Sequence, residues 1–431
     1  MPSRRAVLAT LGSATLAGCG ALSDDAAVAG SWPQRGHDSA RTGTAAPDVD
    51  GPEPPLTTAW SFEHPSRGGT SVSPLLAGDS VYVGYTDGPP SPAAGERTVV
   101  IEALDPATGD RRWSVPVTTT REDRGTYYHA DSLALAGGGE TVLFQTSNGL
   151  CAIGTDGTEK WCFDNVGDGQ LSYQPISPGV DAGTAYVGHY RQIGTDDREP
   201  TFYAVDVEDG RERWRHEFSA WEGQLVYSPA VADGVVYLTE FGAGVKALDA
   251  ADGTELWAES LPVDSAPTVT NGTVFATTNE HAAEELGAIA LDATTGEVRW
   301  SKTDGARSAW APRHLAATDD AIYYPAHDRL VARDAETGDR LWTADGGRPS
   351  ADDLIESGAP AVVGDRIYVG GSAVFVIDRS DGEVLGRYEL DWGIENSIAV
   401  ADGWLYVNTD RTLYGLTECA TEILGHCLRR G

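Results

Sequence analysis

The chain is poor in positive charge and in helical patterns. Lysine occurs only at positions 160, 246 and 302, and 31 Lys and Arg stand against 65 Asp and Glu, a formal net charge of -34. Because phosphate binding requires a basic face, nucleic acid is excluded as a partner. No stretch of the mature chain shows a convincing helical period, which excludes a helical fold.

Patterns for catalysis and metal binding are equally scarce. The nine histidines form no His-Glu-x-x-His pattern, and neither Gly-x-Ser-x-Gly nor a phosphate-cradling glycine loop occurs. The five cysteines include no adjacent pair and no Cys-x-x-Cys-His haem signature, and their spacing does not match a zinc site. The 51 glycines are spread over turns, so they explain hairpins rather than nucleotide binding. We therefore predict no catalytic residue and no metal ligand.

What the chain does contain is one repeated phrase: an apolar pair, an Asp, a short turn ending in Gly, two or three polar residues and a Trp. Clear copies cover residues 103–113, 204–214, 247–257, 290–300 and 332–342, and weaker copies cover 151–161 and 376–388. The phrase recurs every 42 to 53 residues, which indicates a repeat architecture. Each unit divides into four short apolar strands separated by Gly and Asp turns, which is typical of a propeller blade.

The second strand of each unit gives the number of blades. These strands cover residues 81–83, 142–144, 185–187, 236–238, 274–276, 322–324, 367–369 and 405–407. The last unit lacks a closing Trp strand, whereas a Trp strand containing Trp60 precedes the first unit. We therefore predict an all-β, eight-bladed propeller of four-stranded antiparallel blades. In it, the N-terminal Trp60 strand completes the last blade and removes exposed sheet edges.

Each repeated Trp is expected to have a structural role. Burying an indole removes about 150 to 250 Å² from water, which corresponds to an upper bound of about 4 to 6 kcal/mol. Side chains of this size, wedged between neighbouring blades, would dominate the cohesion of the ring. The Asp and Gly of each copy are interpreted as turn formers.

The phrase resembles the PQQ-type propeller repeat, which quinoprotein dehydrogenases share with the non-enzymatic BamB-type assembly factors; the blades are also similar to WD40 and YVTN blades. Residues 32–38, Trp-Pro-Gln-Arg-Gly-His-Asp, followed by Arg-Thr-Gly at 41–43, are similar to the segment before the first blade in many of these proteins. There, His37 and Asp38 are expected to dock against the ring rather than to transfer protons. The resemblance covers about residues 31–418 and is far more specific for fold than for function.

The N-terminus predicts export. Residues 3–8 resemble a twin-arginine signal, and Leu-Ala-Gly-Cys at 16–19 resembles a lipobox. The apolar run between them is too short to span a bilayer, which needs roughly 20 residues. We expect a signal peptide over 1–18, a lipid on Cys19, and attachment to the outer face of the cytoplasmic membrane. An ordinary signal cleaved elsewhere is the alternative.

The predicted layout continues with a tether at 19–30, a lead-in segment at 31–56, the propeller at 57–418 and a C-terminal extension at 419–431. Acidic residues are strewn along the turns rather than gathered in one tail, a pattern that resembles halophilic archaeal proteins. Self-repulsion destabilises such a chain at ordinary ionic strength, whereas molar salt shrinks the Debye length to about 3 Å. We expect a monomer that folds in high salt.

Four cysteines remain after Cys19. If Gly154 pairs with Glu159 across a tight turn, the thiols of Cys151 and Cys162 lie opposite one another. In an exported chain an even number of thiols favours disulfides, here 151 to 162 and 419 to 427, one of three connectivities. Free thiols stay the alternative for the first pair, because directly opposed cysteines are strained at some positions. Cys419 and Cys427 bracket the C-terminal extension.

Propeller ligands usually bind at the mouth of the central channel, beside the start of each innermost strand. The residues just before those strands are aromatic or polar, and we take them as candidate ligand-binding residues: Arg67, Tyr128, His129, Tyr173, Gln174, Trp221, Tyr227, Asp264, Trp310, Arg313, Glu356, Trp392, Glu395 and Asn396. The alternative is that they only cap the channel and fill the blade tops.

The resemblance to quinoprotein dehydrogenases implies further requirements: a vicinal Cys-Cys beside the cofactor, a Trp platform, calcium held by Glu, Asn and Asp, and an Asp general base. The chain has no adjacent cysteines, and its carboxylates near the channel do not match the calcium set. We therefore expect a non-catalytic scaffold that binds a protein partner or an extracellular glycan, with insertions at 87–98 and 192–200 enlarging one rim. PQQ- and calcium-dependent oxidation of an alcohol or a sugar is the alternative.

Overall fold

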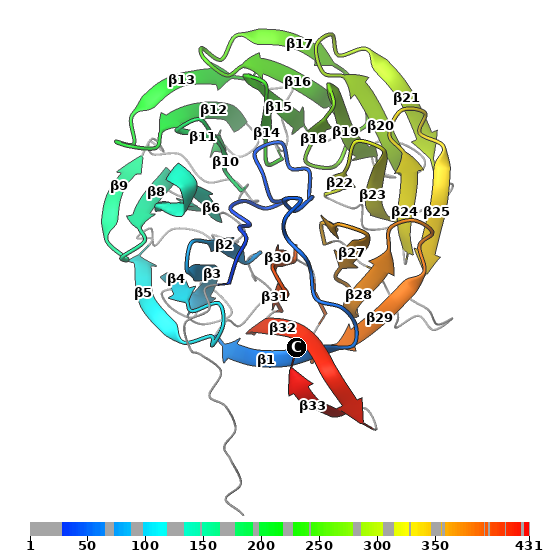
Figure 1. The fold of residues 1–431 in the computed structure, drawn as a ribbon. Coiled ribbons are helices and arrows are strands. Elements are labelled where there is room, and N and C mark those ends of the chain that lie inside the picture. The colour runs from blue at the N-terminus through cyan, green and yellow to red at the C-terminus, as the bar shows by residue number, and fades with distance from the viewer. Residues whose placement is uncertain are drawn as a thin grey trace, which may run out of the picture.

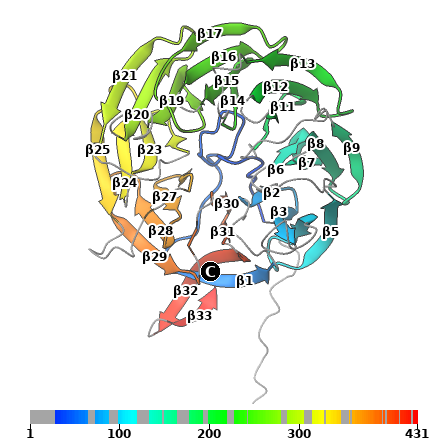
Figure 2. The ribbon, with the colours of Figure 1, turned by 180° about the vertical axis from the view of Figure 1, so that it is seen from behind.

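Short strands and tight turns place the chain in eight antiparallel sheets around a central axis, as the computed structural model shows in Figures 1 and 2. The structure describes residues 28–64, 73–87, 98–118, 133–146, 149–163, 177–192, 198–218, 227–240, 243–278, 286–304, 314–326, 329–345, 355, 358–391, 393–394, 397–409, 411–423 and 426–430. The predicted eight-bladed propeller is confirmed.

Blades 1 to 4 each follow the chain from the innermost strand outwards. Their strands are β2 (Leu75–Ala77), β3 (Ser80–Asp87), β4 (Thr98–Leu104) and β5 (Arg111–Thr118); β6 (Leu133–Ala136), β7 (Thr141–Thr146), β8 (Gly149–Gly154) and β9 (Glu159–Phe163); β10 (Gly179–Asp181), β11 (Thr184–Gln192), β12 (Arg198–Asp206) and β13 (Glu212–Glu217); β14 (Ala230–Ala232), β15 (Val235–Glu240), β16 (Gly244–Asp249) and β17 (Glu255–Glu259). A short 3-10 helix, η2 (Gly137–Gly139), lies in the first turn of blade 2.

Blades 5 to 7 repeat this order, and blade 8 joins the two ends of the propeller. Their strands are β18 (Thr268–Thr270), β19 (Thr273–Thr278), β20 (Gly287–Asp292) and β21 (Val298–Thr303); β22 (Ala316–Ala317), β23 (Ala321–Ala326), β24 (Arg329–Asp334) and β25 (Arg340–Asp345); β26 (Ala361–Val363), β27 (Arg366–Val369), β28 (Ala373–Asp378) and β29 (Val384–Glu389); β30 (Ala399–Ala401), β31 (Trp404–Asn408), β32 (Thr412–Ile423) and β1 (Leu56–Glu63).

Ring closure occurs in blade 8, as predicted. Strand β1 pairs antiparallel with β32, so that Trp60 lies opposite Gly415 and Phe62 opposite Leu413. The order in this sheet is β1-β32-β31-β30, which places the N-terminal strand at the outer rim of the last blade. The chain therefore closes the ring through backbone hydrogen bonds between its two ends.

The repeated Trp joins each blade to the next one. Trp300 of blade 5 donates its indole N–H to the carbonyl of Ala335 in blade 6 at 3.0 Å. The indole also lies over Gly338, where a Cβ would come within 2.7 Å of the ring. The same hydrogen bond to the next turn is made by Trp60, Trp113, Trp161, Trp214, Trp257 and Trp342. The wedging predicted from the sequence is therefore present at seven interfaces of the described ring.

The Asp and Gly of each copy form the turn itself. Asp334 accepts hydrogen bonds at Oδ1 from the backbone N–H groups of Glu336 and Thr337, at 3.1 and 2.8 Å. Gly338 has φ +72° and donates its N–H to the Asp334 carbonyl at 2.9 Å. A left-handed backbone at this point suits glycine, because other residues adopt it at a cost.

Blade 7 departs from the pattern. At the register of the Trp it has Gly386, opposite Val376, where a Cβ would lie 2.5 Å from Pro54. The missing indole therefore leaves room for the lead-in segment. Tyr388, two residues later, contacts the next blade instead, through hydrogen bonds between its hydroxyl and the backbone N–H and hydroxyl of Thr58.

The structure pairs the four cysteines that it describes. Cys151 lies opposite Cys162 on β8 and β9, and the two form a disulfide. Glu159 pairs with Ile153 rather than with Gly154, because the strand bulges at Lys160; the cysteines still face each other.

Cys419 forms the second disulfide, with Cys427. It joins the far end of β32 to β33 (His426–Arg430) in a hairpin that projects from the ring beside β1 (Figures 1 and 2).

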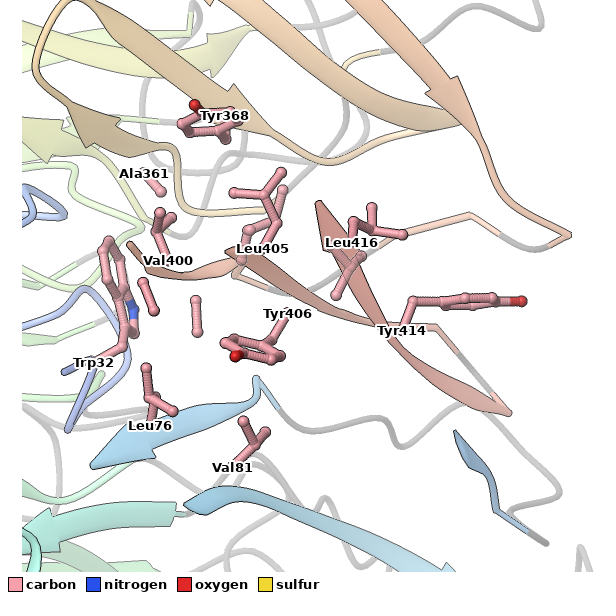
Figure 3. Packing of buried hydrophobic residues seen from close by; sticks show 14 of the residues in the cluster. Trp32, Leu76, Val81, Ala361, Tyr368, Val400, Leu405, Tyr406, Tyr414 and Leu416 are labelled. Carbon is pink, nitrogen blue, oxygen red and sulfur yellow. The ribbon is translucent and has the colours of Figure 1, made fainter. Parts of the chain in front are cut away.

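Apolar side chains fill the interfaces between blades. The largest cluster lies where blade 8 meets its neighbours and contains Trp32, Leu76, Tyr368, Val400 and Tyr406 (Figure 3). All five of these side chains are at most 1% exposed. Among the described residues, no helix is long and apolar enough to span a membrane.

Candidate functional site

The predicted ring of ligand-binding residues falls largely on segments that the structure does not describe. Outside the described residues lie Arg67, Tyr128, His129, Tyr173, Gln174, Trp221, Trp310, Arg313, Glu356, Trp392, Glu395 and Asn396, and so does the predicted lipidation site Cys19. Of the predicted ring, Tyr227 and Asp264 belong to the described residues.

Tyr227 of blade 4 and Asp264 of blade 5 meet across the interface between their blades. The Tyr227 hydroxyl donates a hydrogen bond to Oδ1 of Asp264, and both residues are buried. Their backbone N–H groups donate to the carbonyls of Thr239 and Thr277, which fixes both residues at the starts of their inner strands. The structure thus brings two predicted ring members together, in a contact that also ties two blades.

The lead-in segment occupies the centre of the ring. Figure 1 shows it as the dark blue trace that loops between the innermost strands. It offers an acceptor to a backbone N–H of the inner strand in blades 1 to 7 in turn: Leu76 to Trp32, Leu135 to Pro33, Val180 to the Gln34 side chain, Val231 to Ser39, Val269 to Ala40, Ala317 to Thr42 and Val362 to Gly43. In blade 8 the contact is to the turn after β30, where the N–H of Gly403 donates to the Asp50 carbonyl. The inner strands of blades 1 to 7 would otherwise leave their donors unpaired, so the segment satisfies the inner edge of these sheets.

Arg41 holds the middle of this path. Its guanidinium is buried and donates to the carbonyls of Pro229 at 2.6 Å, Arg35 at 2.8 Å and Ser177 at 3.1 Å. Pro229 belongs to blade 4 and Ser177 to the start of blade 3, so one side chain links the segment to two blades. Its own carbonyl accepts from the hydroxyl of Thr268 in blade 5.

His37 and Asp38 dock within the ring, as the sequence predicts. The His37 ring packs edge-on against the Trp32 indole, with centroids 4.8 Å apart. Asp38 accepts hydrogen bonds from the backbone N–H of Thr42 at 2.9 Å and from its hydroxyl at 2.5 Å. These contacts shape the loop of the lead-in segment that reaches from blade 3 to blade 6.

A buried polar cluster lies between blades 8 and 1. Glu102 is fully buried and accepts a hydrogen bond from the Tyr85 hydroxyl at 2.7 Å, and it forms an ion pair with Arg111 at 2.8 Å. Burial, followed by the hydrogen bond to Glu102, raises the pKa of Tyr85, so its hydroxyl stays a donor. His64 stacks on Tyr85 with centroids 5.1 Å apart, and its Nε2 lies 3.1 Å from Oδ1 of Asn408.

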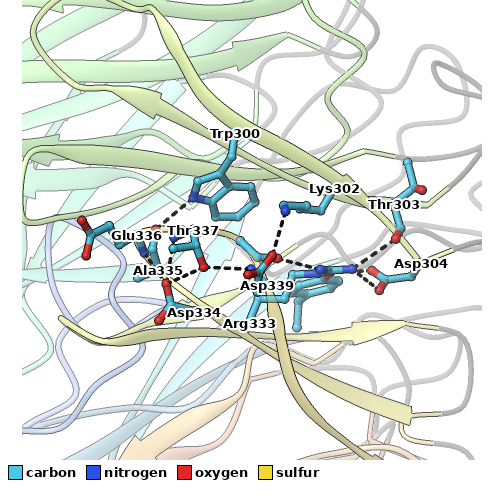
Figure 4. A network of polar contacts seen from close by, with 12 residues as sticks. Trp300, Lys302, Thr303, Asp304, Arg333, Asp334, Ala335, Glu336, Thr337 and Asp339 are labelled. Carbon is cyan, nitrogen blue, oxygen red and sulfur yellow. Dashed lines mark hydrogen bonds and ion pairs between the residues drawn. The ribbon is translucent and has the colours of Figure 1, made fainter.

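A second buried network joins blades 5 and 6 (Figure 4). Arg333 forms an ion pair with Asp304, donates to the Tyr324 hydroxyl at 2.7 Å and donates to the Gly338 carbonyl at 2.7 Å. The Tyr324 hydroxyl in turn donates to Asp304. Burial and the nearby Asp304 carboxylate raise the pKa of Tyr324. The other copies have an aliphatic residue at the position of Arg333: Leu104, Ile153, Val205, Leu248, Leu291 and Ile377.

The resemblance implies a PQQ and calcium site, whose predicted residues lie almost all outside the described part of the chain. Among the described residues, no group of three or more His, Cys, Asp or Glu side chains could hold a metal ion. The four cysteines after Cys19 form the two disulfides, and no two cysteines are adjacent in the sequence.

The path of the lead-in segment is the feature that sequence reasoning missed. The similarity of residues 32–38 to a known lead-in motif signalled that the segment matters, but no local pattern showed which blades it contacts. Some of its partners are distant in the chain, as in the hydrogen bond from Gly403 to Asp50, which lie 353 residues apart (403 minus 50).

The assembly factor BamB and a bacterial protein kinase are among the proteins that are similar to this chain in sequence. Outer membrane protein assembly factor BamB from Escherichia coli is 25% identical over 395 residues, which cover 84% of this chain and 89% of that protein. The serine/threonine-protein kinase AfsK from Streptomyces coelicolor is 34% identical over 149 residues, 33% of this chain, and the match spans only 16% of the kinase.

One solved structure shows how far the fold extends beyond sequence similarity. Quinohemoprotein alcohol dehydrogenase from Comamonas testosteroni superimposes with a TM-score of 0.66 at 15% identity, over 93% of this chain and 82% of that one. At this identity the likeness establishes the fold alone. The family described as outer membrane protein assembly factor BamB matches residues 97–260 and 242–402, which together make up most of the chain. The protein is therefore a member of the BamB family of PQQ-type β-propellers.

Proposed function

We propose that the protein is a non-catalytic scaffold, anchored by lipid at the outer face of the cytoplasmic membrane, that binds a protein partner. The observation that carries this proposal is the lead-in segment, which hydrogen-bonds to the inner strands of blades 1 to 7 and to the turn after β30 in blade 8, and so occupies the centre of the ring. The faces and rims of the disc are then the surfaces left for recognition. The relatives named as assembly factors favour a protein over a glycan as the partner.

Two long hairpins support a docking role for one face. Strands β11 and β12 of blade 3 have nine residues each, and β3 and β4 of blade 1 have eight and seven, whereas β15 and β16 of blade 4 have six. Both hairpins join the second strand of a blade to the third, so they extend from the same face of the disc. The predicted insertions 87–98 and 192–200 lie in the sequence between the two strands of each hairpin. We propose that a partner contacts both insertions together.

Purification of the tagged protein from its own membranes in high salt tests the scaffold role. Replacing residues 88–97 and 193–197 by Asn-Gly turns should release the partner, while a variant with only one loop replaced should retain part of it. A stable partner that ignores both loops would contradict docking at this face. Failure to recover any protein partner, with glycan retained on the purified protein, would favour the glycan alternative.

The anchor is tested separately. Cys19→Ser should move the protein from the membrane fraction to the medium, because one thioether-linked cysteine is the proposed attachment point. Unchanged partitioning would overturn the lipid anchor and leave the scaffold role untouched.

Dye-linked oxidation of alcohols and sugars, measured after adding PQQ and calcium, tests the enzymatic alternative. No turnover above the level of a heat-unfolded control is expected. Substrate-dependent dye reduction that needs both PQQ and calcium would replace the scaffold proposal by a quinoprotein dehydrogenase.

A further inference from the structure

Every outermost strand that follows a repeated turn begins with the same β-bulge. In blade 4, Leu248 pairs with Glu255 and Ala247 pairs with Trp257, which leaves Leu256 as the extra residue. A bulge turns the side chain of the extra residue away from the regular alternation of the strand. The bulge residues of blades 1 to 7 are Arg112, Lys160, Arg213, Leu256, Arg299, Leu341 and Leu385.

In blades 1, 3 and 5 the bulge residue is an arginine with partners on its own blade. Arg112 forms an ion pair with Asp105 at 2.9 Å, and Arg213 with Asp206 at 2.7 Å. Arg299 makes the same contact to Asp292 at 2.7 Å. The arginine at each of these bulges therefore makes its ion pair with the turn of its own blade.

In blades 4, 6 and 7 the bulge residue is a leucine that faces solvent. Leu256, Leu341 and Leu385 are 50%, 52% and 40% exposed, and Val298, close by in blade 5, is 41% exposed. In the part of the chain that the structure describes, these four are the exposed large apolar side chains. We call them the apolar rim.

The apolar rim is confined to one half of the disc. Its residues lie on β17, β21, β25 and β29, which follow one another around the outside of the ring in Figure 1. Single exposed apolar residues need no explanation when they are scattered over a surface. The four exposed side chains of the apolar rim lie at nearly the same register on four consecutive blades, so they are not scattered. Three of them are leucines at the bulge position where blades 1, 3 and 5 have arginine.

Charge around the apolar rim points to the chemistry of its partner. The turn-and-strand segments of blades 4 to 7, residues 249–257, 292–300, 334–342 and 378–386, contain eleven acidic and three basic residues. The segments of blades 1 to 3, residues 105–113, 154–161 and 206–214, contain eight acidic and five basic residues. The net charge is thus -2 per segment, 3 minus 11 over four segments, in the half that carries the exposed leucines, and -1 per segment, 5 minus 8 over three segments, in the other half. The difference arises because the half with the exposed leucines has fewer basic residues.

We propose that the apolar rim binds an extended segment of a partner protein in which apolar side chains alternate with lysine or arginine. Apolar side chains of the segment would cover the leucines, and its basic groups would face the surrounding carboxylates. A second copy of this chain is disfavoured as the occupant, because its own acidic turns would meet those of the rim. The inference rests on the proposed scaffold function and adds a contact surface and a partner chemistry to it.

The bulge arginines of blades 1, 3 and 5 suggest which substitutions to test in blades 4, 6 and 7. Leu256→Arg, Leu341→Arg and Leu385→Arg, combined, introduce the residue that blades 1, 3 and 5 already carry in the same bulge, so the fold should be kept. Arg112→Leu with Arg213→Leu is the matched control on the opposite half. A third variant with glutamine at the three leucine positions removes the apolar groups without adding charge.

The probe is a short peptide of alternating Leu and Lys, compared with its Leu and Glu counterpart by fluorescence anisotropy. We expect both leucine variants to weaken binding of the Leu/Lys peptide by about tenfold or more, because buried leucines are lost from the contact. The control variant should bind as the native protein does, and the Leu/Glu peptide should not bind. Equal binding by all variants, or binding of both peptides, would overturn the proposal.

Photo-crosslinking in native membranes checks the natural occupant. A crosslinking amino acid at position 256 or 341 should capture a partner segment with alternating apolar and basic residues, and one at 112 or 213 should capture none. Capture of a second copy, of lipid or of no protein would refute the proposed occupant. If a loop-dependent partner still co-purifies in that case, the scaffold function stands and the rim inference alone fails; if no partner is found by either route, both fail.

Discussion

Single glycines decide how closely one blade can approach the next. Gly338 has φ +72°, and a Cβ there would lie 2.7 Å from the Trp300 ring. Gly272 has a similar φ of +63°, but a Cβ there would have no heavy atom within 4 Å. The two positions therefore separate the cost of a left-handed backbone from the cost of a blocked indole.

Gly338→Ala should destabilise the protein more than Gly272→Ala. The second change carries only backbone strain of about 1 kcal/mol, whereas the first adds overpacking against Trp300, for a total of about 2 to 4 kcal/mol. Urea denaturation of both variants in the same salt measures the difference. Equal losses would show that the indole can move aside at no cost.

The pKa of a turn carboxylate depends on the arginine at the bulge of the same blade. The hydrogen bond from Arg299, with those from the backbone N–H of Thr295 and Thr294, lowers the pKa of Asp292 to about 2 from an ordinary value of 3.8. Because the pKa is lowered in the folded state, this contact stabilises the protein above about pH 4 and is lost as the pH falls towards 2.

Arg299→Leu should raise the pKa of Asp292 towards its ordinary value, since the first of its hydrogen-bond donors is removed. A carboxyl carbon NMR titration of the native protein and the variant measures this shift directly. Arg211→Leu, which changes an exposed arginine of a different turn, is the control and should leave the Asp292 titration where it is.

Among the elements, the lead-in segment has the most far-reaching role. It hydrogen-bonds to the inner strands of blades 1 to 7 and to the first turn of blade 8, and Arg41 anchors its middle through three carbonyl groups. Blade 7 is adapted to the same segment, because Gly386 leaves the space that Pro54 fills. The segment therefore acts as an inner ring that holds the outer one.

Arg41→Met should lower the free energy of unfolding by about 2 to 4 kcal/mol, because three buried carbonyls lose their donor. Hydrogen exchange should quicken at the inner-strand N–H groups of Val231 and Val269, which pair with the neighbouring residues Ser39 and Ala40. Exposed Arg211→Met is the matched control and should change stability by less than about 0.5 kcal/mol. An unchanged exchange pattern in Arg41→Met would mean that the segment holds its path without this side chain.

At the scale of the whole molecule, charge opposes the compact ring. A net charge of -34 is spread over a closed disc, and the ion pairs of its surface offset only part of the repulsion. The ring is closed by the pairing of β1 with β32, which come from opposite ends of the propeller sequence.

The protein should lose its structure below roughly molar salt and recover it when salt is restored, because screening removes long-range repulsion. Far-UV circular dichroism and tryptophan fluorescence over a potassium chloride series measure this transition. A sucrose series at low salt is the control, since it favours burial without screening charge. A protein fully folded in dilute buffer would contradict the halophilic interpretation.

Much of the fold could be predicted because its signals are local. The Asp, Gly and Trp of one copy lie within a stretch of nine residues, as at 334–342. Each turn and its following strand can therefore be predicted from a short local pattern. Ring closure could be predicted because the last unit lacks a Trp strand, whereas an additional Trp strand containing Trp60 precedes the first unit. The candidate site fared differently, because most of its predicted residues lie outside the described part of the chain and only Tyr227 and Asp264 are brought together.

The eight blades and their turns follow from the sequence alone, because they depend on contacts between neighbours in the chain. The closing strand could be predicted as well, although it pairs with β32 at the other end of the propeller, because one Trp strand is extra at the start and one is missing at the end. Tertiary structure alone decided that the lead-in segment fills the centre, that Arg333 pairs with Asp304, and that three leucines stand where other blades have an ion-paired arginine. Those outcomes depend on which distant residues the ring brings into contact and which it leaves exposed. A residue type in a repeat does not reveal this until the blades are packed.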